Sequence, residues 1–396
     1  MKFRNEFSRH RKILMFALTV KAGMAAYFTI LPLYLISQAF SPIKVGLLIG
    51  TGNFVAMILA PYGGATLNRT SNRNLLVVSG LATGFFLASF ALVNSEVFAF
   101  IATILLTISN TFLRLGLLTA IAKIKSQRRA SAMGWLNISN SLGSSLGFIL
   151  SGWVADIKGY AMTFPISALP IILVSVFIWI SSNWERKSVY ISDDLHHHQS
   201  IQNLIQTPKK IVLPMLFLLC DMGITSAWQT YMPIYLVNYL GWSATLLGGL
   251  MATQTLVYLV CQPLTTYLAD RTGYKPLLVV GLSSYGILVS LMALTSSIWL
   301  IFILMFLNAA FASPIYPTSL AMAAEVPPEE RGTAMGFMLA SSNLAGVLGP
   351  VIGGVIVSFL TIPTSGFAYS FIPALTVSVV GQLAFSRQTV NLPKPK

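Results

Sequence analysis

Leu75-Leu76-Val77-Val78 recurs as Leu277-Leu278-Val279-Val280, and the separation of 202 residues is kept well beyond these two tetrads. The further matches at this separation are Pro61 with Pro263, Arg129 with Arg331, Ala132-Met133-Gly134 with Ala334-Met335-Gly336, Gly147 with Gly349, and Gly152 with Gly354. A constant offset over so many positions is typical of a duplicated structural unit. The chain is therefore expected to fold as two similar halves.

The chain is too apolar for a soluble protein. Of its 396 residues, 55% are hydrophobic and 9% are charged, and the mean hydropathy is +0.74. Crossing about 30 Å of hydrocarbon takes roughly 20 helical residues. Twelve apolar stretches are long enough, and they begin near Ile13, Ile43, Leu75, Val97, Ala130, Tyr160, Ile211, Thr245, Leu277, Ile298, Thr333 and Phe367. The composition predicts an all-α membrane protein and excludes a soluble enzyme.

The positions of the basic residues predict the orientation. With the N-terminus inside, only Lys44 and Lys158 fall on the outer side, whereas the other basic residues outside the stretches fall on the inner side. This bias is typical of membrane proteins, so the net charge of +14 reports topology rather than nucleic-acid binding. We expect an integral protein of the cytoplasmic membrane, embedded in the lipid bilayer, with both termini in the cytoplasm.

The repeat extends over six stretches in each half. Pro32 matches Pro233 at a separation of 201, and Gly159 matches Gly366 at a separation of 207. We expect an N-terminal six-helix bundle over residues 1–182, a cytoplasmic linker over 183–210 and a C-terminal six-helix bundle over 211–396. Two copies in the same orientation are related by an axis along the membrane normal.

The histidines and cysteines favour no metal site. His196-His197-His198 lies in the predicted linker, where three adjacent side chains do not readily converge on one ion, so a solvated loop is expected. Cys220 and Cys261 both lie in predicted helices, which favours neither a disulfide nor metal ligation. The sequence also lacks a Gly-rich nucleotide loop, so we expect neither a cofactor nor ATP hydrolysis.

Two loops carry a known signature, Gly-x-x-x-Asp-Arg/Lys-x-Gly-x-Arg/Lys. The second-half copy, residues 266–275, departs from it only by Thr266 in place of the first glycine, whereas the first-half copy, residues 64–73, lacks the acid and the second glycine. The signature is that of the major facilitator superfamily, which the chain resembles over essentially its whole length. The resemblance implies twelve transmembrane helices in two pseudo-symmetric six-helix bundles.

The resemblance also implies a cytoplasmic gate at these loops. Asp270 with Arg271 is expected to contact the start of the fifth helix near Arg129, because a carboxylate is stabilised at a helix N-terminus. Asn68 supplies no charge, so the symmetric contact near Arg331 should be weaker. The expected gate residues are Asn68, Arg69, Arg129, Asp270, Arg271, Lys275 and Arg331. A solvated turn with positive-inside arginines is the alternative.

The fifth helix resembles a glycine motif of the family's proton-driven exporters, Gly-x8-Gly-x3-Gly-Pro-x2-Gly-Gly. The residues at those spacings are Gly134, Gly143, Gly147, Phe148, Ser151 and Gly152, so the proline is missing. The corresponding stretch after Gly336 keeps Pro350. Small residues also let membrane helices approach closely. The motif therefore favours either export by antiport or tight helix packing.

Lys21, Arg114 and Asp221 are the ionisable residues that fall well inside predicted spans. Each lies about four residues to the cytoplasmic side of the middle of its helix, roughly 6 Å from the midplane. A charge in hydrocarbon costs at least about 2.5 to 3.5 kcal/mol. We therefore expect the three side chains to face one another or a central cavity, which the resemblance places between the halves.

Polar and aromatic residues at helical spacing extend this candidate site. Its other expected members are Tyr27, Asn110, Asn137, Asn140, Thr225, Trp228, Gln229, Tyr231, Gln254 and Tyr258. Polar stripes in apolar helices indicate a wet cavity. They are also found where polar side chains hold membrane helices together.

We expect a secondary active transporter that works by alternating access, as a monomer, and exports its solute in exchange for protons. Asp221 is the expected proton carrier, and a permanent pair with Lys21 is the alternative. With Lys21 and Arg114, the site should favour an anionic, zwitterionic or amphipathic small molecule over a strongly cationic one. An importer or facilitator of an organic anion, sugar or amino acid, and a membrane receptor that moves nothing, stay open. No nucleophile, base and orienting group recur together, so an enzyme is not expected.

Overall fold

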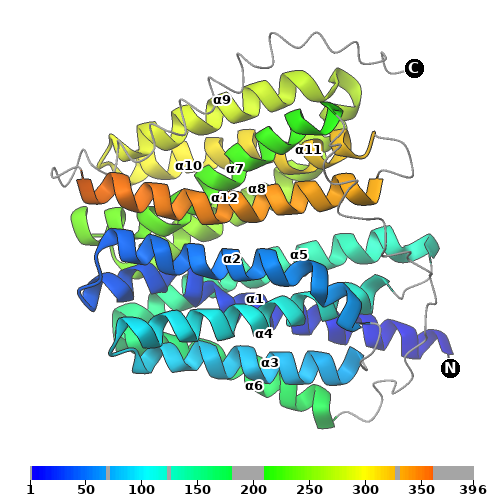
Figure 1. Cartoon of the computed structure of the whole chain (residues 1–396), viewed down its shortest axis with the longest axis horizontal. Coiled ribbons are helices and arrows are strands. Elements are labelled where there is room, and N and C mark those ends of the chain that lie inside the picture. Colours follow the sequence, from blue (N-terminus) through cyan, green and yellow to red (C-terminus); the bar gives the residue numbers. More distant parts are fainter. Residues whose placement is uncertain (1, 68–71, 123–125, 181–208, 326–330, 360–396) are drawn as a thin grey trace. The chain divides into compact units, whose positions relative to one another are not determined.

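The computed structural model describes residues 2–67, 72–122, 126–180, 209–325 and 331–359, and these fold into long helices (Figure 1). The backbone alone is described for residues 2–11, 60–67, 126–132 and 331–333 and for a few other helical residues, whose side chains lie outside the description. The helices are α1 (Lys2–Ser37), α2 (Pro42–Leu67), α3 (Asn72–Ser89), α4 (Glu96–Ala122), α5 (Ser126–Lys158), α6 (Tyr160–Ile180), α7 (Lys209–Ile234), α8 (Ala244–Thr272), α9 (Tyr274–Ala293), α10 (Ile298–Ala312), α11 (Ile315–Ala323) and α12 (Arg331–Phe359). A short 3-10 helix (Phe90–Leu92) follows α3, and a π-helical turn (Tyr235–Tyr239) continues α7. No strand occurs among the described residues.

The helices occupy the predicted stretches. Apart from α1, which begins at Lys2, each helix that carries a predicted stretch begins within four residues of its expected start. Helices α10 and α11 share one apolar span, Ile298–Ala323, and α9 contributes the shorter apolar segment Pro276–Met292. The twelfth predicted stretch, near Phe367, lies outside the described residues.

The fold divides into two compact units. Unit 1 comprises Met1–Ser41, Thr51–Ile191 and Leu236–Leu256, and unit 2 comprises Pro42–Gly50, Ser192–Tyr235 and Val257–Lys396. Each unit thus includes one short segment from the other half of the sequence. The division into bundles at residues 183–210 stays a prediction, since all of that linker but its last two residues, which begin α7, lies outside the described residues.

Each unit has an apolar interior. In unit 1, α1 packs against α5 and α6, and α3 packs against α4 and α6, with Phe16, Phe90 and Phe164 fully buried. In unit 2, α7 packs against α11 and α12, and α9 packs against α10, with Phe217 and Tyr285 buried. The apolar residues that predicted membrane spans therefore also supply the contacts between helices.

Repeat-related glycines make close contacts between helices. In unit 1, a Cβ atom on Gly147 of α5 would overlap the backbone of Ala22 in α1. In unit 2, a Cβ atom on Gly349 of α12 would overlap the backbone of Gly223 in α7. Gly147 and Gly349 are 202 residues apart and Ala22 and Gly223 are 201 apart, so the duplication is visible in the packing. Tight packing thus accounts for these motif glycines.

Replacing Gly147 with Ala is expected to lower the thermal stability of the detergent-purified protein, whereas Gly134→Ala in the same helix should leave it unchanged or raise it. Alanine favours a helix over glycine by about 0.5–1 kcal/mol at either position. At Gly147 this gain is opposed by overpacking, which costs about 1–3 kcal/mol. At Gly134 nothing lies within 4 Å of the added carbon. Equal shifts of the unfolding midpoint would contradict the close contact with α1.

Glycines also end two helices. Gly273 (φ 85°) separates α8 from α9, and Gly159 (φ 84°) separates α5 from α6, with backbone angles that side chains disfavour. The N–H of Gly273 donates to the carbonyl of Ala269 at 2.9 Å, which closes the last turn of α8. The second glycine of the loop signature therefore makes the tight turn between these helices.

Candidate functional site

Unit 1 carries the two cations of the expected site. Lys21 of α1 is partly buried, and its ammonium lies within Coulombic range of the guanidinium of Arg114 in α4, which is exposed. The carboxylates among the described side chains of unit 1 belong to Glu96, at the start of α4, and Asp156, near the end of α5. Glu96 lies about 27 Å from Arg114 along the helix axis. The described carboxylates of unit 1 therefore leave this pair of charges uncompensated.

Polar residues of α4 and α5 accompany these cations. Asn110, one turn before Arg114, is partly buried, as is Asn140 of α5, while Asn137 is exposed. A guanidinium facing hydrocarbon is costly, so the exposed side of α4 at Arg114 favours contact with water rather than lipid.

Two other expected site residues are packed inside unit 1. Tyr27 is only 9% exposed, and its ring packs edge-on against Phe28 at 5.5 Å and Phe90 at 5.9 Å between centroids. Gln254 belongs to the α8 segment of unit 1 and is also buried. Their contact with a solute stays a prediction.

Unit 2 carries the acidic member, Asp221 of α7. This side chain is 2% exposed, and its Oδ1 atom is buried and accepts no hydrogen bond from a described residue. The hydroxyls of Tyr258 in α8 and Tyr285 in α9 lie within Coulombic range of the carboxyl group. Few buried polar atoms in native proteins lack a partner, and each calls for an explanation such as a functional role.

The same face of α7 continues past Asp221. Thr225 lies one turn later, and its hydroxyl is 2.7 Å from the hydroxyl of Tyr285. Trp228 is 1% exposed, and its buried Nε1 has no hydrogen-bond partner among the described residues, while Gln229 is partly buried. The sequence pattern thus identified a buried polar cluster but missed Tyr285, which comes from another helix. Because Asp221 lies in unit 2 and the cations lie in unit 1, their meeting stays a prediction.

Asp156 has a structural role that the sequence reasoning missed. It lies near the C-terminal end of α5 and caps the first turn of α8 within unit 1. Its Oδ1 accepts from the N–H of Ala244 at 2.8 Å, and its Oδ2 accepts from the N–H and the hydroxyl of Thr245 at 2.8 and 2.5 Å. The backbone of Ala244 also closely approaches Gly152, a member of the glycine motif. Helices from the two halves of the sequence are joined here.

Tyr231 makes the corresponding connection in unit 2. It is fully buried, and its hydroxyl lies 2.5 Å from the carbonyl oxygen of Pro350 in α12 and 3.2 Å from that of Pro42 in α2. Gly46 of α2 has no room for a Cβ beside this hydroxyl. The structure therefore gives Tyr231 a contact between helices, and its expected contact with solute stays a prediction.

These two connections are related by the repeat but use different chemistry. The start of α8 near Ala244 matches the start of α2 near Pro42 at the separation of 202. At this separation the position equivalent to Asp156 is 358, which is serine. At the separation of 201 that relates α1 to α7, the position equivalent to Tyr231 is 30, which is isoleucine. By the predicted topology both connections lie at the outer side of the membrane.

Most of the expected gate lies outside the description. Asn68 and Arg69 are outside the described residues, and the same holds for the side chains of Arg129, Asp270, Lys275 and Arg331. The Arg271 side chain is exposed and lies over the ring of Tyr267, 4.7 Å from its centroid. The gate therefore stays a prediction.

Among described residues, no three His, Cys, Asp or Glu side chains form a group that could hold a metal ion.

A family model decides the identity of the fold. The model of the Major Facilitator Superfamily matches residues 13–239 and 215–396. The chain belongs to the Major Facilitator Superfamily. It is accordingly an integral membrane protein of a transporter family, as the loop signature predicted.

Several curated members of the Major Facilitator Superfamily are similar to the chain. An uncharacterized transporter of the superfamily, YuxJ of Bacillus subtilis, is 23% identical over 349 residues, which cover 83% of this chain and 84% of that protein. The class B tetracycline resistance protein of Escherichia coli is 21% identical over 319 residues, or 78% of each chain. A Na(+), Li(+), K(+)/H(+) antiporter of Planococcus maritimus is 30% identical over 167 residues, or 40% of this chain and 37% of that one.

Solved structures support the same fold. A variant of the nucleoside transporter NupG superposes with a TM-score of 0.78 at 16% identity, covering 96% of this chain and 99% of that chain. A bacterial homologue of the human lysosomal transporter Spinster, inward-facing and occupied, gives 0.76 at 14% identity and covers 99% of both chains. These likenesses establish the major facilitator fold and leave the solute open.

Proposed function

We propose that the chain is a secondary active transporter that exports a small solute in exchange for protons by alternating access. The observation that carries the proposal is Asp221, a buried carboxyl group in a membrane helix with one oxygen that accepts no hydrogen bond from a described residue. Ionisable residues inside membrane spans are costly and commonly mark ion or proton pathways. Neighbouring hydroxyls, such as that of Tyr285, can supply or withdraw hydrogen bonds as the protein changes conformation.

The names of two relatives support this proposal. One is a tetracycline resistance protein, a name consistent with export of a drug, and the other is a Na(+), Li(+), K(+)/H(+) antiporter, a name consistent with coupling to protons. The nucleoside transporters among the solved structures are too distant in sequence to argue for a solute.

The pair of Lys21 and Arg114, which no described carboxylate of unit 1 compensates, supports an anionic, zwitterionic or amphipathic solute. Two neighbouring positive charges repel a strongly cationic molecule and attract a carboxylate or phosphate. Arg114 also offers a planar set of N–H donors that suits such groups.

Alternating access needs contacts that close one side of the protein in one state and are broken in the other state. We assign this role on the outer side to Asp156, which caps α8, and to Tyr231, which joins α2 with α12. Both sets of hydrogen bonds join helices from different halves of the sequence. Their rupture would accompany opening of the site to the outside.

A transport assay in proteoliposomes tests the function. The purified chain is reconstituted with a pH-sensitive dye inside, and tetracycline, a nucleoside, Na⁺ and organic anions are added in turn with and without an imposed pH gradient. Solute movement coupled to a change of internal pH supports the proposal. Gradient-independent equilibration indicates a facilitator, concentrative uptake into cells indicates an importer, and binding without flux indicates a receptor; each of these outcomes contradicts it.

Arg114→Gln is expected to weaken binding of transported anions by about tenfold while leaving neutral solutes nearly unaffected, because a partly desolvated charge–charge interaction is worth a few kcal/mol or less. Thermal-shift titration with anionic and neutral members of the solute panel measures this. Arg73→Gln, at the start of α3, serves as a matched control for loss of an arginine. Equal losses for anionic and neutral solutes would contradict a direct role of the Arg114 charge.

A further inference from the structure

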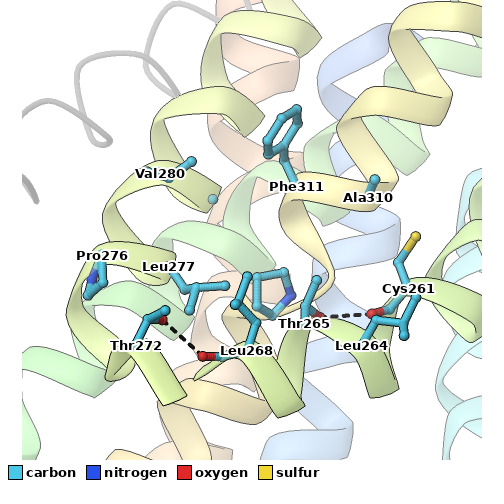
Figure 2. Close-up of a pocket in the computed structure, with 12 residues that line it drawn as sticks. Cys261, Leu264, Thr265, Leu268, Thr272, Pro276, Leu277, Val280, Ala310 and Phe311 are labelled. Carbon is cyan, nitrogen blue, oxygen red and sulfur yellow. Dashed lines mark hydrogen bonds between the residues drawn. The ribbon is translucent and has the colours of Figure 1, made fainter. Parts of the chain in front are cut away.

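A cavity opens on unit 2 between α8, α9 and α10 (Figure 2), and Asp221, Tyr258 and Tyr285 are not among the residues that line it. Its volume is about 500 Å³, within the range of small-molecule sites. The side chains of Leu264, Leu268, Val280 and Phe311 line it and are 66, 47, 51 and 42% exposed. The cavity therefore opens to the surroundings of the helices and presents hydrocarbon to them.

The polar atoms of the wall are already engaged. The Thr265 hydroxyl bonds to the carbonyl of Cys261 and to the hydroxyl of Ser313, each at 3.0 Å. The Thr272 hydroxyl donates to the carbonyl of Leu268 at 2.9 Å, as Figure 2 shows. Apart from the free thiol of Cys261, which is only a weak hydrogen-bond donor, no described side chain of the wall offers an unused polar group, so the part of the ligand that enters is expected to be apolar.

The cavity has the depth of one lipid leaflet. It follows α8 from Thr272 to Cys261, which is about 16 Å at the rise of an α-helix. Half of the hydrocarbon thickness is about 15 Å. The turn between α8 and α9 is predicted to lie at the cytoplasmic surface, so the occupant belongs to the cytoplasmic leaflet.

A basic residue lies at the surface end of this face. Arg271 follows Leu268 by three positions and Leu264 by seven, so it shares their side of α8. Its side chain is exposed, and the guanidinium is held over the ring of Tyr267 at 4.7 Å. Guanidinium groups bind phosphate through paired N–H donors, and the cytoplasmic leaflet carries anionic lipids.

We propose that this cavity binds an anionic phospholipid of the cytoplasmic leaflet, with one acyl chain between α8, α9 and α10 and the phosphate on Arg271. The apolar wall favours an acyl chain, the depth of the cavity matches one leaflet, and the positive charge of the arginine favours an anionic headgroup. The site is separate from the proposed proton and solute site, so it stands whether or not the chain couples transport to protons.

Lipid titration of the purified full-length protein, followed by native mass spectrometry, tests the proposal. Phosphatidylglycerol and phosphatidylcholine with identical acyl chains are compared, and phosphatidylglycerol should bind about fivefold more tightly, as expected for one basic contact at the surface. Arg271→Gln should reduce this preference to about one while leaving phosphatidylcholine binding unchanged.

Val280→Trp should fill the cavity and abolish tight binding of both lipids. Val260→Trp is the matched control, because Val260 is an exposed residue of α8 that does not line the cavity; it should leave binding unchanged. Val280→Phe, a smaller change, should give an intermediate loss if the tryptophan variant folds poorly. Three outcomes would overturn the proposal. The two tryptophan variants could bind lipid equally, or Arg271→Gln could keep the headgroup preference. In the third, tetracycline would displace the lipid, while neither phospholipid showed saturable binding.

Discussion

Asp221→Asn is expected to reduce solute movement driven by a pH gradient to the level of protein-free vesicles, while solute binding and folding persist. Asparagine has nearly the same shape and fits the buried space, but it cannot take up and release a proton. The Oδ1 atom of Asp221 accepts no hydrogen bond from a described residue, so the substitution breaks no such bond at that atom. The measurement is flux in proteoliposomes with an imposed pH gradient, alongside exchange of labelled solute without one.

The control variants separate proton carriage from a structural ion pair. Asp221→Glu keeps the ionisable group and should retain part of the driven flux, although the extra methylene must fit a site that is 2% exposed. If Asp221 only pairs with Lys21, exchanging the two residues should restore function. Full driven flux in Asp221→Asn, or rescue by the exchange, would refute the proposed carrier.

The sequence predicts the helices of this fold well because the membrane imposes a simple rule. Every span needs a long apolar stretch, and α6 begins at Tyr160 and α10 at Ile298, as the apolar stretches predicted. Asp221 was singled out in the same way, since a carboxylate in such a stretch stands out; the structure shows that it is buried, and its role stays a prediction. Tyr285 was missed because a single tyrosine in an apolar helix carries no signal until packing brings it beside Thr225.

Asp156 was missed for a different reason. A carboxylate at the end of a span resembles any solvated surface charge, and its partner at Ala244 is 88 residues away. One signal was present, however. Asp156 lies in the last turn of α5, where a negative charge is disfavoured by the dipole of its own helix. A residue in such a position suggests a partner elsewhere, here the N-terminus of α8.

Asp156→Ala is expected to shift the protein toward the state that is open to the outside. The substitution removes three hydrogen bonds to the start of α8, two of them to backbone N–H groups. Loss of such a cap costs about 1–3 kcal/mol, which corresponds to a change of roughly 5- to 150-fold in the equilibrium between the two states. Since the bonds exist only in the closed arrangement under our proposal, the whole cost falls on that state.

The shift is measured by labelling a single cysteine from the outside. In a background with Cys220 and Cys261 replaced by Ser, Leu247→Cys places a thiol on α8 at a position with no exposed area. Its rate of reaction with a membrane-impermeant maleimide should rise in Asp156→Ala. Thr245→Val, which removes only the hydroxyl contact, should give a smaller rise, and Ser358→Ala at the repeat-equivalent position should give none. An unchanged labelling rate in Asp156→Ala would contradict the role of this cap.

Tyr231→Phe provides the final test, because it removes the hydroxyl that bonds to Pro350 and Pro42 without changing the ring. If one opening motion breaks both connections, the free-energy costs add, and the labelling rate of the double variant should rise by the product of the two single effects. If each connection only holds its own helices together, Tyr231→Phe should leave the labelling of position 247 unchanged, with or without Asp156. The double variant therefore distinguishes a shared outer closure from two independent packing contacts.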